Sequence, residues 1–369
     1  MIQTNIGRGQ KPQNIFLIAD HLQNTYKKFV RTFQKFQNKV IQEWVKEQME
    51  TEDLLYKDPI IELNFQFEKG KSLPEFVQEG ILDPLIPSIF KIAPYRHQSE
   101  AIEKVCKENR NIIVSTGTGS GKSICFWVPI INTCLEMKRQ GLDGTKAIVI
   151  FPMNALANSQ YNNIAKLLHG TGLTIGRYTG ETAVPESEAE RILEKIYKRP
   201  KYDCEILSRD KMRENPPDIL ITNYVMLDLI LTRHEDKKLF PEHHRGYLKY
   251  IVLDEIHTYS GNRGADVACL IRRLKYKTDT QGKIRCIGTS ATIQDNKKSS
   301  GSTAIIEFAE KIFGEKFDAS SLIEATYVNL EISKEDILPL PPTILIQDSD
   351  LNEFNGTINR IIPIAEKLL

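Results

Sequence analysis

The feature that most constrains the fold of this chain is a glycine-rich stretch at residues 116–123. Its residues in order are Thr116, Gly117, Thr118, Gly119, Ser120, Gly121, Lys122 and Ser123. A short apolar run, 111–115, precedes the stretch, and an apolar helical run follows it. Glycines let successive backbone N–H groups curl toward an anion, and the N-terminus of the next helix adds positive charge. The pattern therefore predicts a strand, a phosphate-binding loop and a helix, in that order.

Two side chains of this loop have a predicted role in binding a nucleotide. Lys122 is expected to reach the β- and γ-phosphates, and the hydroxyl of Ser123 is expected to ligate Mg²⁺. The usual pattern begins with glycine, whereas this loop begins with Thr116, which weakens its interpretation as the loop of a small-molecule kinase. ATP and Mg²⁺ are the expected cofactors, bound by the whole of 116–123.

A second motif, which is acidic, follows an apolar run at 250–253. The run leads into Asp254, Glu255, Ile256 and His257. An unbroken apolar run is typical of a central parallel strand, and α/β sheets bind ligands beyond the carboxyl ends of such strands. We expect Asp254 to hold Mg²⁺, directly or through water, and Glu255 to deprotonate the attacking water. The alternative is an acidic strand end that only begins a helix, which the upstream loop makes improbable.

Further segments share their order with one family. They are 95–98 (YRHQ), 151–156 (FPMNAL), 179–181 (TGE), 217–224 (PDILITNY), 254–257 (DEIH) and 290–292 (SAT). The chain resembles the first RecA-like domain of a superfamily 2 DExH/DEAD-box helicase, whose loops often start with Ala or Thr. The wording of 151–160, 216–227 and 253–274 is similar to the YprA-like helicases of bacterial DNA repair and phage defence.

The resemblance implies an α/β fold, a RecA-like P-loop NTPase domain with a central, mostly parallel sheet. We expect a helical N-terminal region at 1–90 and the ATP-binding domain at 91–315. Within that domain, 181–217 is dense in charge and is predicted to be a helical surface insertion. Residues 316–369, with several prolines, are predicted to be a linker or the start of a further module.

The family motifs suggest which residues contact the base and the nucleic acid. The amide of Gln98 carries a donor and an acceptor that can pair with the adenine edge. Residues that follow predicted strands can hold nucleic-acid phosphates without recognising bases. The nucleic-acid candidates are Pro152, Asn154, Arg177, Thr179, Gly180, Thr222 and Asn223. The alternative for the Asn and Thr residues is ordinary helix capping.

A polar turn is expected to couple the two ligand sites. Ser290, Ala291 and Thr292 follow a predicted strand at 285–288. Their hydroxyl groups are placed to relay between the DEIH box and the nucleic-acid path. His257 is expected to hydrogen-bond toward them when nucleotide is bound.

The N-terminal region carries one clear periodic signal. Between Leu22 and Val45, apolar residues recur every three or four positions, which predicts one long amphipathic helix. This helix is expected to pack against its own ATP-binding domain or to dock a partner. No apolar run is long enough for a membrane span, and the six cysteines form no C-x-x-C pair. A cytoplasmic protein without a membrane partner is therefore expected.

Charge does not exclude a nucleic-acid partner. The formal net charge is only +1, but local clusters decide phosphate binding. We expect a nucleic-acid ligand, with DNA favoured over RNA. A complete motor has two RecA-like domains, and the expected second one lies in cis or on a partner chain, so this sequence is expected to be a truncated form or one subunit of a split enzyme.

Two functions stay open at this stage. One is the ATP-binding half of a helicase or translocase. The other is a non-catalytic nucleic-acid-binding or scaffold subunit of a bacterial defence complex, although an intact Lys122, Asp254 and Glu255 argue against lost chemistry. A small-molecule kinase fails, because it explains neither the DEIH box nor 290–292.

Overall fold

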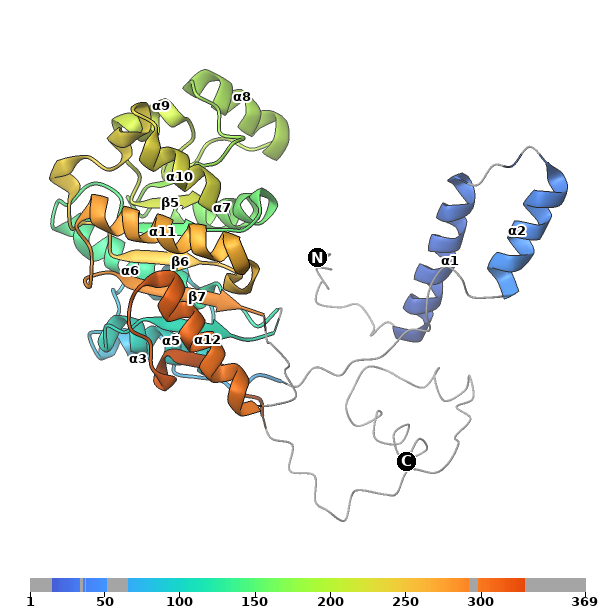
Figure 1. Ribbon diagram of the computed structural model, residues 1–369, viewed down its shortest axis with the longest axis horizontal. Helices are drawn as coiled ribbons and strands as arrows, with labels where there is room; N and C mark the ends of the chain where they lie inside the picture. Colours follow the sequence, from blue (N-terminus) through green and yellow to red (C-terminus); the bar gives the residue numbers. More distant parts are fainter. Residues whose placement is uncertain are drawn as a thin grey trace, which may run out of the picture. The chain divides into compact units, whose positions relative to one another are not determined.

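The computed structural model describes residues 15–33, 36, 38–51, 66–117, 119–291 and 298–328. The chain divides into two compact units, of which one comprises Met1–Asn64 with Asn329–Leu369 and the other comprises Phe65–Val328. The second unit contains the sheet and its helices (Figure 1). Among the helices of the described ranges, none is both long and apolar enough to cross a membrane.

The predicted single helix over 22–45 is wrong, because the structure has two helices there. They are α1 (Ile15–Phe33) and α2 (Lys39–Thr51). Asn38 begins the second helix: its side-chain oxygen accepts a hydrogen bond from the N–H of Val40 at 2.9 Å, and its carbonyl accepts one from Gln42 at 3.0 Å. Asparagine is a favoured residue at helix starts because it satisfies free N–H groups in this way. The apolar periodicity continues across the break and so conceals it.

One parallel sheet forms the centre of the second unit. Its strand order is β4-β3-β5-β2-β6-β7-β1-β8, and every neighbouring pair is parallel. The strands are β1 (Ile112–Ser115), β2 (Ala147–Ile150), β3 (Ile175–Tyr178), β4 (Glu205–Ile206), β5 (Ile219–Thr222), β6 (Tyr250–Leu253), β7 (Arg285–Ser290) and β8 (Leu322–Glu324). The predicted α/β fold with a central parallel sheet is confirmed.

Helices cover both faces of this sheet. The α-helices are α3 (Leu73–Gln78), α4 (Ile86–Ile89), α5 (Arg96–Ile102), α6 (Ile124–Arg139), α7 (Asn154–Leu168), α8 (Glu186–Tyr197), α9 (Arg209–Glu214), α10 (Tyr224–Thr232), α11 (Gly261–Thr278) and α12 (Lys298–Phe313). A π-helical turn, η1 (Glu103–Lys107), continues α5, and the 3₁₀-helices are η2 (Glu235–Leu239), η3 (Glu242–His244), η4 (Ile256–Thr258) and η5 (Ala319–Ser321). Helices α3 to α7 contribute to the core on one face, and α10 to α12 to the core on the other.

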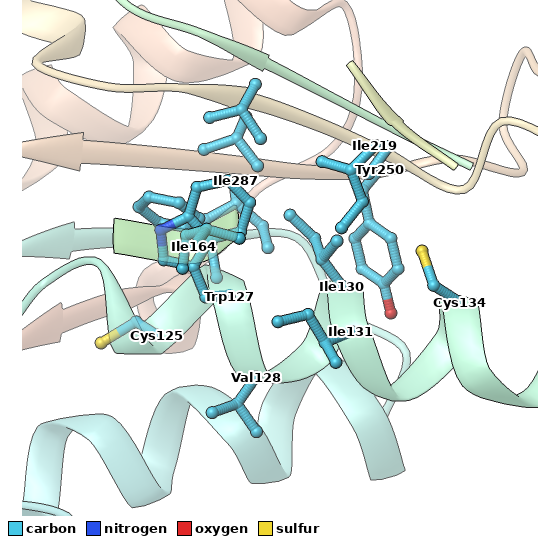
Figure 2. Close-up of a cluster of buried hydrophobic side chains, with 14 of the residues drawn as sticks. Cys125, Trp127, Val128, Ile130, Ile131, Cys134, Ile164, Ile219, Tyr250 and Ile287 are labelled. Carbon is cyan, nitrogen blue, oxygen red and sulfur yellow. The ribbon is translucent and has the colours of Figure 1, made fainter. Parts of the chain in front are cut away.

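The alternation of side chains along the strands divides the core in two. On β1, Val114 joins the cluster on the α6 face, whereas its neighbour Ile113 joins the opposite cluster. Successive strand residues point to opposite faces, so a strand buried on both sides must be apolar throughout. Figure 2 shows Trp127 and Ile130 of α6 gathered with Tyr250 of the sheet. The Tyr250 hydroxyl is satisfied within this core, 2.9 Å from the hydroxyl of Thr133.

The charged segment at 181–217 is helical in part. It contains α8 and α9, but β4 lies between them and pairs with β3 at the edge of the sheet. The carboxylate of Glu205 on β4 is buried and accepts two hydrogen bonds of 2.8 Å from the guanidinium of Arg199. Such a bidentate pair lets a charged residue occupy an otherwise apolar edge. The segment therefore extends the sheet as well as covering it.

Candidate nucleotide and nucleic-acid sites

The sheet order brings the two predicted nucleotide motifs to one edge. The loop at 116–123 follows β1, the DEIH box follows β6, and β7 lies between these strands. All three strands are parallel, so their carboxyl ends meet at the same edge. Motif positions that are distant in the sequence are therefore neighbours in the fold.

Backbone conformation in the loop depends on two of its glycines. Gly119 and Gly121 have φ values of +86° and +76°, a left-handed region that side chains disfavour. The hydroxyls of Thr116 and Ser120 lie 2.6 Å apart and close the loop across its base. The α-helix that follows begins at Ile124, directly after Ser123. Thr118 lies outside the described residues.

Lys122 points into the space between the two motifs. Its Nζ donates to the carbonyls of Thr116 at 3.1 Å and Ser290 at 3.2 Å. It also lies 3.5 Å from Oε1 of Glu255. The side chain is 11% exposed, so the ammonium is held by neutral carbonyls and one carboxylate. A nucleotide phosphate would be a stronger partner for this cation than a carbonyl.

Thr289 connects the carboxylate of Asp254 to the backbone of Glu255 in the DEIH box. Its hydroxyl donates to Oδ1 of Asp254 and accepts a hydrogen bond of 3.1 Å from the N–H of Glu255. Burial raises the pKa of Asp254 and the neighbouring Glu255 raises it further, while the Thr289 hydrogen bond and Lys122 act in the opposite direction. Sequence reasoning missed Thr289, although it immediately precedes the predicted polar turn.

Glu255 carries both backbone strain and an unsatisfied oxygen. Its φ and ψ of 49° and 54° are left-handed, which is unfavourable for a residue with a side chain and is often found at functional sites. Its Oε2 is buried and has no hydrogen-bond partner among the described residues. The Nδ1 of His257 lies 3.4 Å from that oxygen. A carboxylate oxygen without a partner is available to accept a proton.

The coupling residues differ in part from expectation. Ser290 is the last residue of β7 and does not follow the strand, because β7 extends to Ser290 beside β1. Its hydroxyl lies 3.1 Å from Nδ1 of His257, so these two predicted groups are in contact. Ala291 follows directly, and Thr292 lies outside the described residues.

Gln98 is directed at the loop itself. Its amide nitrogen donates to the carbonyls of Ser120 at 3.3 Å and Gly121 at 3.1 Å, and its oxygen accepts from the N–H of Tyr95 at 2.9 Å. The neighbouring His97, which the sequence did not single out, lies 3.0 Å from the Ser120 carbonyl. In this arrangement Gln98 supports the loop. The amide N–H groups that were expected to pair with adenine donate to loop carbonyls instead.

The nucleic-acid candidates fall into two groups. Pro152, Asn154, Gly180 and Asn223 line a common pocket of about 470 Å³. Thr179 and Thr222 are fully buried; the Thr222 hydroxyl donates to the Tyr178 carbonyl at 2.7 Å. Thr179 and Thr222 therefore hold the ends of the strands from within the core and are not exposed to a ligand.

Arg177 also lies outside that pocket. Its guanidinium donates to the side-chain oxygen of Asn158 and lies 5.7 Å from the ring centroid of Tyr161.

A larger cavity, of about 1080 Å³, opens beside Lys138, Asp218 and His244. Those residues lie at the amino ends of the strands, away from the motifs, so its size does not make it the nucleotide site.

The residues at the sheet edge fit ATP and Mg²⁺. Beyond Gly119 there is open space, since an added Cβ would meet no heavy atom within 4 Å, and Glu255 retains a buried, unpartnered oxygen. Lys122 and the loop N–H groups would hold phosphates, and Ser123 with Asp254 would hold the cation. Within the described ranges no three His, Cys, Asp or Glu side chains gather as a metal-binding group.

Comparison with known families decides the assignment. A family model described as DEAD/DEAH box helicase matches residues 95–300. The chain belongs to this family. The match includes every motif from Gln98 to Ala291, and the fold is that of the family's first RecA-like domain.

Two curated relatives are similar to more than half of the chain. The Druantia protein DruE of Escherichia coli (strain UMEA 4076-1) is 28% identical over 54% of the chain and 16% of its own length. The uncharacterized ATP-dependent helicase YprA of Bacillus subtilis (strain 168) is 31% identical over 62% of the chain and 27% of its own length. The chain thus spans only a minor part of these relatives.

A solved structure agrees on the architecture. The crystal structure of the DUF1998 helicase MrfA bound to DNA and AMPPNP is 25% identical, with a TM-score of 0.50. The alignment covers 75% of this chain and 33% of that one. This chain therefore corresponds to one portion of the longer MrfA chain.

Proposed function

We propose that this chain is the ATP-binding N-terminal half of an ATP-dependent helicase or translocase that acts on DNA. The observation that carries the proposal is the 3.5 Å approach of Lys122 to Glu255. A phosphate-binding cation and a candidate base meet there, at one edge of the sheet. The presence of DNA and AMPPNP in the MrfA structure supports both ligands.

The chain's own residues suggest a division of labour in hydrolysis. Bound ATP and Mg²⁺ would supply the transferable phosphoryl group and the charge that neutralises it. Lys122 would exchange its carbonyl partners for phosphate oxygens, while Thr289 holds the Asp254 carboxylate beside the backbone N–H of Glu255. Glu255, with Oε2 unpartnered, would accept the proton of the attacking water.

We further propose that efficient turnover needs a second RecA-like domain, in cis or on a partner chain. The described residues form a single parallel sheet, and stepping along a strand requires two such domains that close on ATP. An arginine finger from the second domain is worth roughly 10³ to 10⁵ in rate.

We also propose that the enzyme acts in the cytoplasm, where ATP and nucleic acid are both present. Its six cysteines are free thiols in the structure.

Binding of single-stranded nucleic acid tests this proposal directly. Fluorescence anisotropy would be measured for labelled single-stranded DNA and RNA of equal length, with and without a non-hydrolysable ATP analogue. Binding of DNA that tightens with the analogue is the expected result. Absence of binding to either strand would overturn the proposal, and a clear preference for RNA would overturn its DNA assignment.

A further inference from the structure

The pocket that four of the nucleic-acid candidates line is also lined by an arginine that no motif predicted. Its wall is completed by Tyr224, Val225, Met226 and Arg263. Arg263 lies in the first turn of α11, which begins soon after the DEIH box. It is the one charged side chain in the lining of this pocket, so the described wall has a positive character.

The partners of neighbouring arginines show what distinguishes Arg263. Further along α11, Arg273 pairs with Asp228, and Arg272 donates to two backbone carbonyls. Among the described residues, no carboxylate lies within ion-pair distance of Arg263. Its guanidinium instead lies 6.0 Å from the ring centroid of Tyr224. A cation over an aromatic face is held in place while its N–H groups stay available.

The two asparagines of the pocket each donate an amide N–H to another side chain. The amide nitrogen of Asn223 donates to Asn154 at 2.9 Å, and that of Asn154 donates to Glu181 at 3.2 Å. The Asn223 oxygen accepts from the N–H of Met226 at 2.8 Å and caps α10. Arg263 is the lining side chain that offers an anionic ligand a positive charge together with several N–H donors.

We propose that Arg263 binds a phosphate of the nucleic-acid strand in this pocket, and that Tyr224 positions it. This inference rests on the proposed function and names a contact that the helicase motifs do not supply. The chemistry is a charge-assisted contact to a backbone phosphate, which carries no base preference. The exposed side chain of Val225 offers an apolar surface beside it.

The position of Tyr224 connects this contact to the ATP site. Its ring meets that of Tyr259 edge-to-face, with centroids 6.1 Å apart. Tyr259 is fully buried, lies two residues after His257, and its hydroxyl has no hydrogen-bond partner among the described residues. Arg263 is therefore linked, through the rings of Tyr224 and Tyr259, to the segment that carries Glu255.

The test compares two arginines of the same helix. Binding of a labelled oligo-dT strand to the whole chain would be measured over a range of salt concentrations for Arg263→Gln and for the control Arg273→Gln. Arg263→Gln should weaken binding about tenfold at low salt and lower the slope of log affinity against log salt by about 0.7, one single-strand phosphate contact. Arg273→Gln should change neither quantity.

Three further variants separate contact from positioning. Arg263→Lys should keep the salt slope, because the charge remains. Tyr224→Leu should weaken binding without changing the slope, and Tyr224→Phe should restore it, because the ring and not the hydroxyl supports the guanidinium. ATP affinity, measured by calorimetry, should stay unchanged in every variant and so report an intact fold.

The outcomes distinguish this inference from the function beneath it. If the unaltered chain binds DNA and Arg263→Gln binds it equally well with the same slope, Arg263 is not a phosphate contact and the proposed function stands. If the unaltered chain binds neither DNA nor RNA, both fail.

Discussion

The Nζ atom of Lys122 lies 3.5 Å from Oε1 of Glu255, although the two residues follow strands that are separated in the sheet by β7. The ammonium also donates to the Ser290 carbonyl at the end of that intervening strand. Lys122 thus joins the loop, the DEIH box and the end of β7. A phosphate that draws Lys122 away would release Glu255 and Ser290 together, which gives nucleotide binding a direct effect on both.

Lys122→Ala should weaken the binding of ATP–Mg²⁺ at least tenfold, because a charge-assisted contact to phosphate is lost. Calorimetry on the purified chain measures this affinity. Lys166→Ala, which removes an exposed lysine from α7, is the matched control and should bind ATP normally. An unchanged affinity for Lys122→Ala would remove this residue from the site.

Glu255→Gln should retain ATP but lose turnover in the complete motor. The amide preserves the shape of the side chain, yet it cannot accept a proton from water. Binding by calorimetry and phosphate release in a coupled assay give the two quantities separately. Turnover close to that of the unaltered enzyme would mean that another group is the base.

Asp254→Asn should stabilise the fold at neutral pH. Burial raises the pKa of Asp254, so the folded state binds its proton more tightly than the unfolded chain does. The resulting stability is present below the unfolded pKa and is lost as pH rises through the folded pKa. Asparagine cannot ionise, so this variant should unfold at a higher temperature near pH 7, with the gain shrinking toward pH 4.

Thermal unfolding followed by circular dichroism between pH 4 and 8 measures that difference. Asp203→Asn is a control of opposite sign, since the hydrogen bond from His169 and that from the Gly170 N–H lower the pKa of Asp203. It should give no gain near pH 7. A lower unfolding temperature for Asp254→Asn at pH 7 would show that its charge is not a cost to the fold.

Lys146→Met should destabilise the protein by about 3 to 5 kcal/mol, because it leaves a buried carboxylate without its counter-ion. Lys146 and Asp218 are 0% and 1% exposed and form an ion pair at the amino ends of β2 and β5. Lys211→Met breaks a half-exposed pair with Glu214 and should cost less than about 1 kcal/mol. Urea unfolding compares them, and equal losses would contradict this account.

The sequence predicts the sheet edge well because two physical signals coincide there. Apolar runs such as 250–253 are typical of central strands buried on both faces. Polar or glycine-rich motifs that follow such runs must then emerge at one edge of a parallel sheet. Lys122, Asp254 and Glu255 could be placed together from this reasoning alone, before any distance was known.

The sequence predicts the partners of individual side chains less well. Thr289 and Ser290 are adjacent and both polar, so no alternation shows which one bonds Asp254. Arg263 sits among several charged residues of α11, and only its position over Tyr224 sets it apart. The break between α1 and α2 is hidden in the sequence because the apolar spacing continues across it. Asn38 nevertheless caps the start of a new helix there.

The most direct measurement of the central claim is ATP turnover by the whole chain, with and without single-stranded DNA, alone and then completed by a second RecA-like domain. We predict slow turnover with little stimulation by DNA for the chain alone. The completed motor should show turnover that DNA stimulates, since the second domain contributes arginine worth roughly 10³ to 10⁵ in rate. Robust DNA-stimulated turnover by a monomer of these 369 residues would contradict the account.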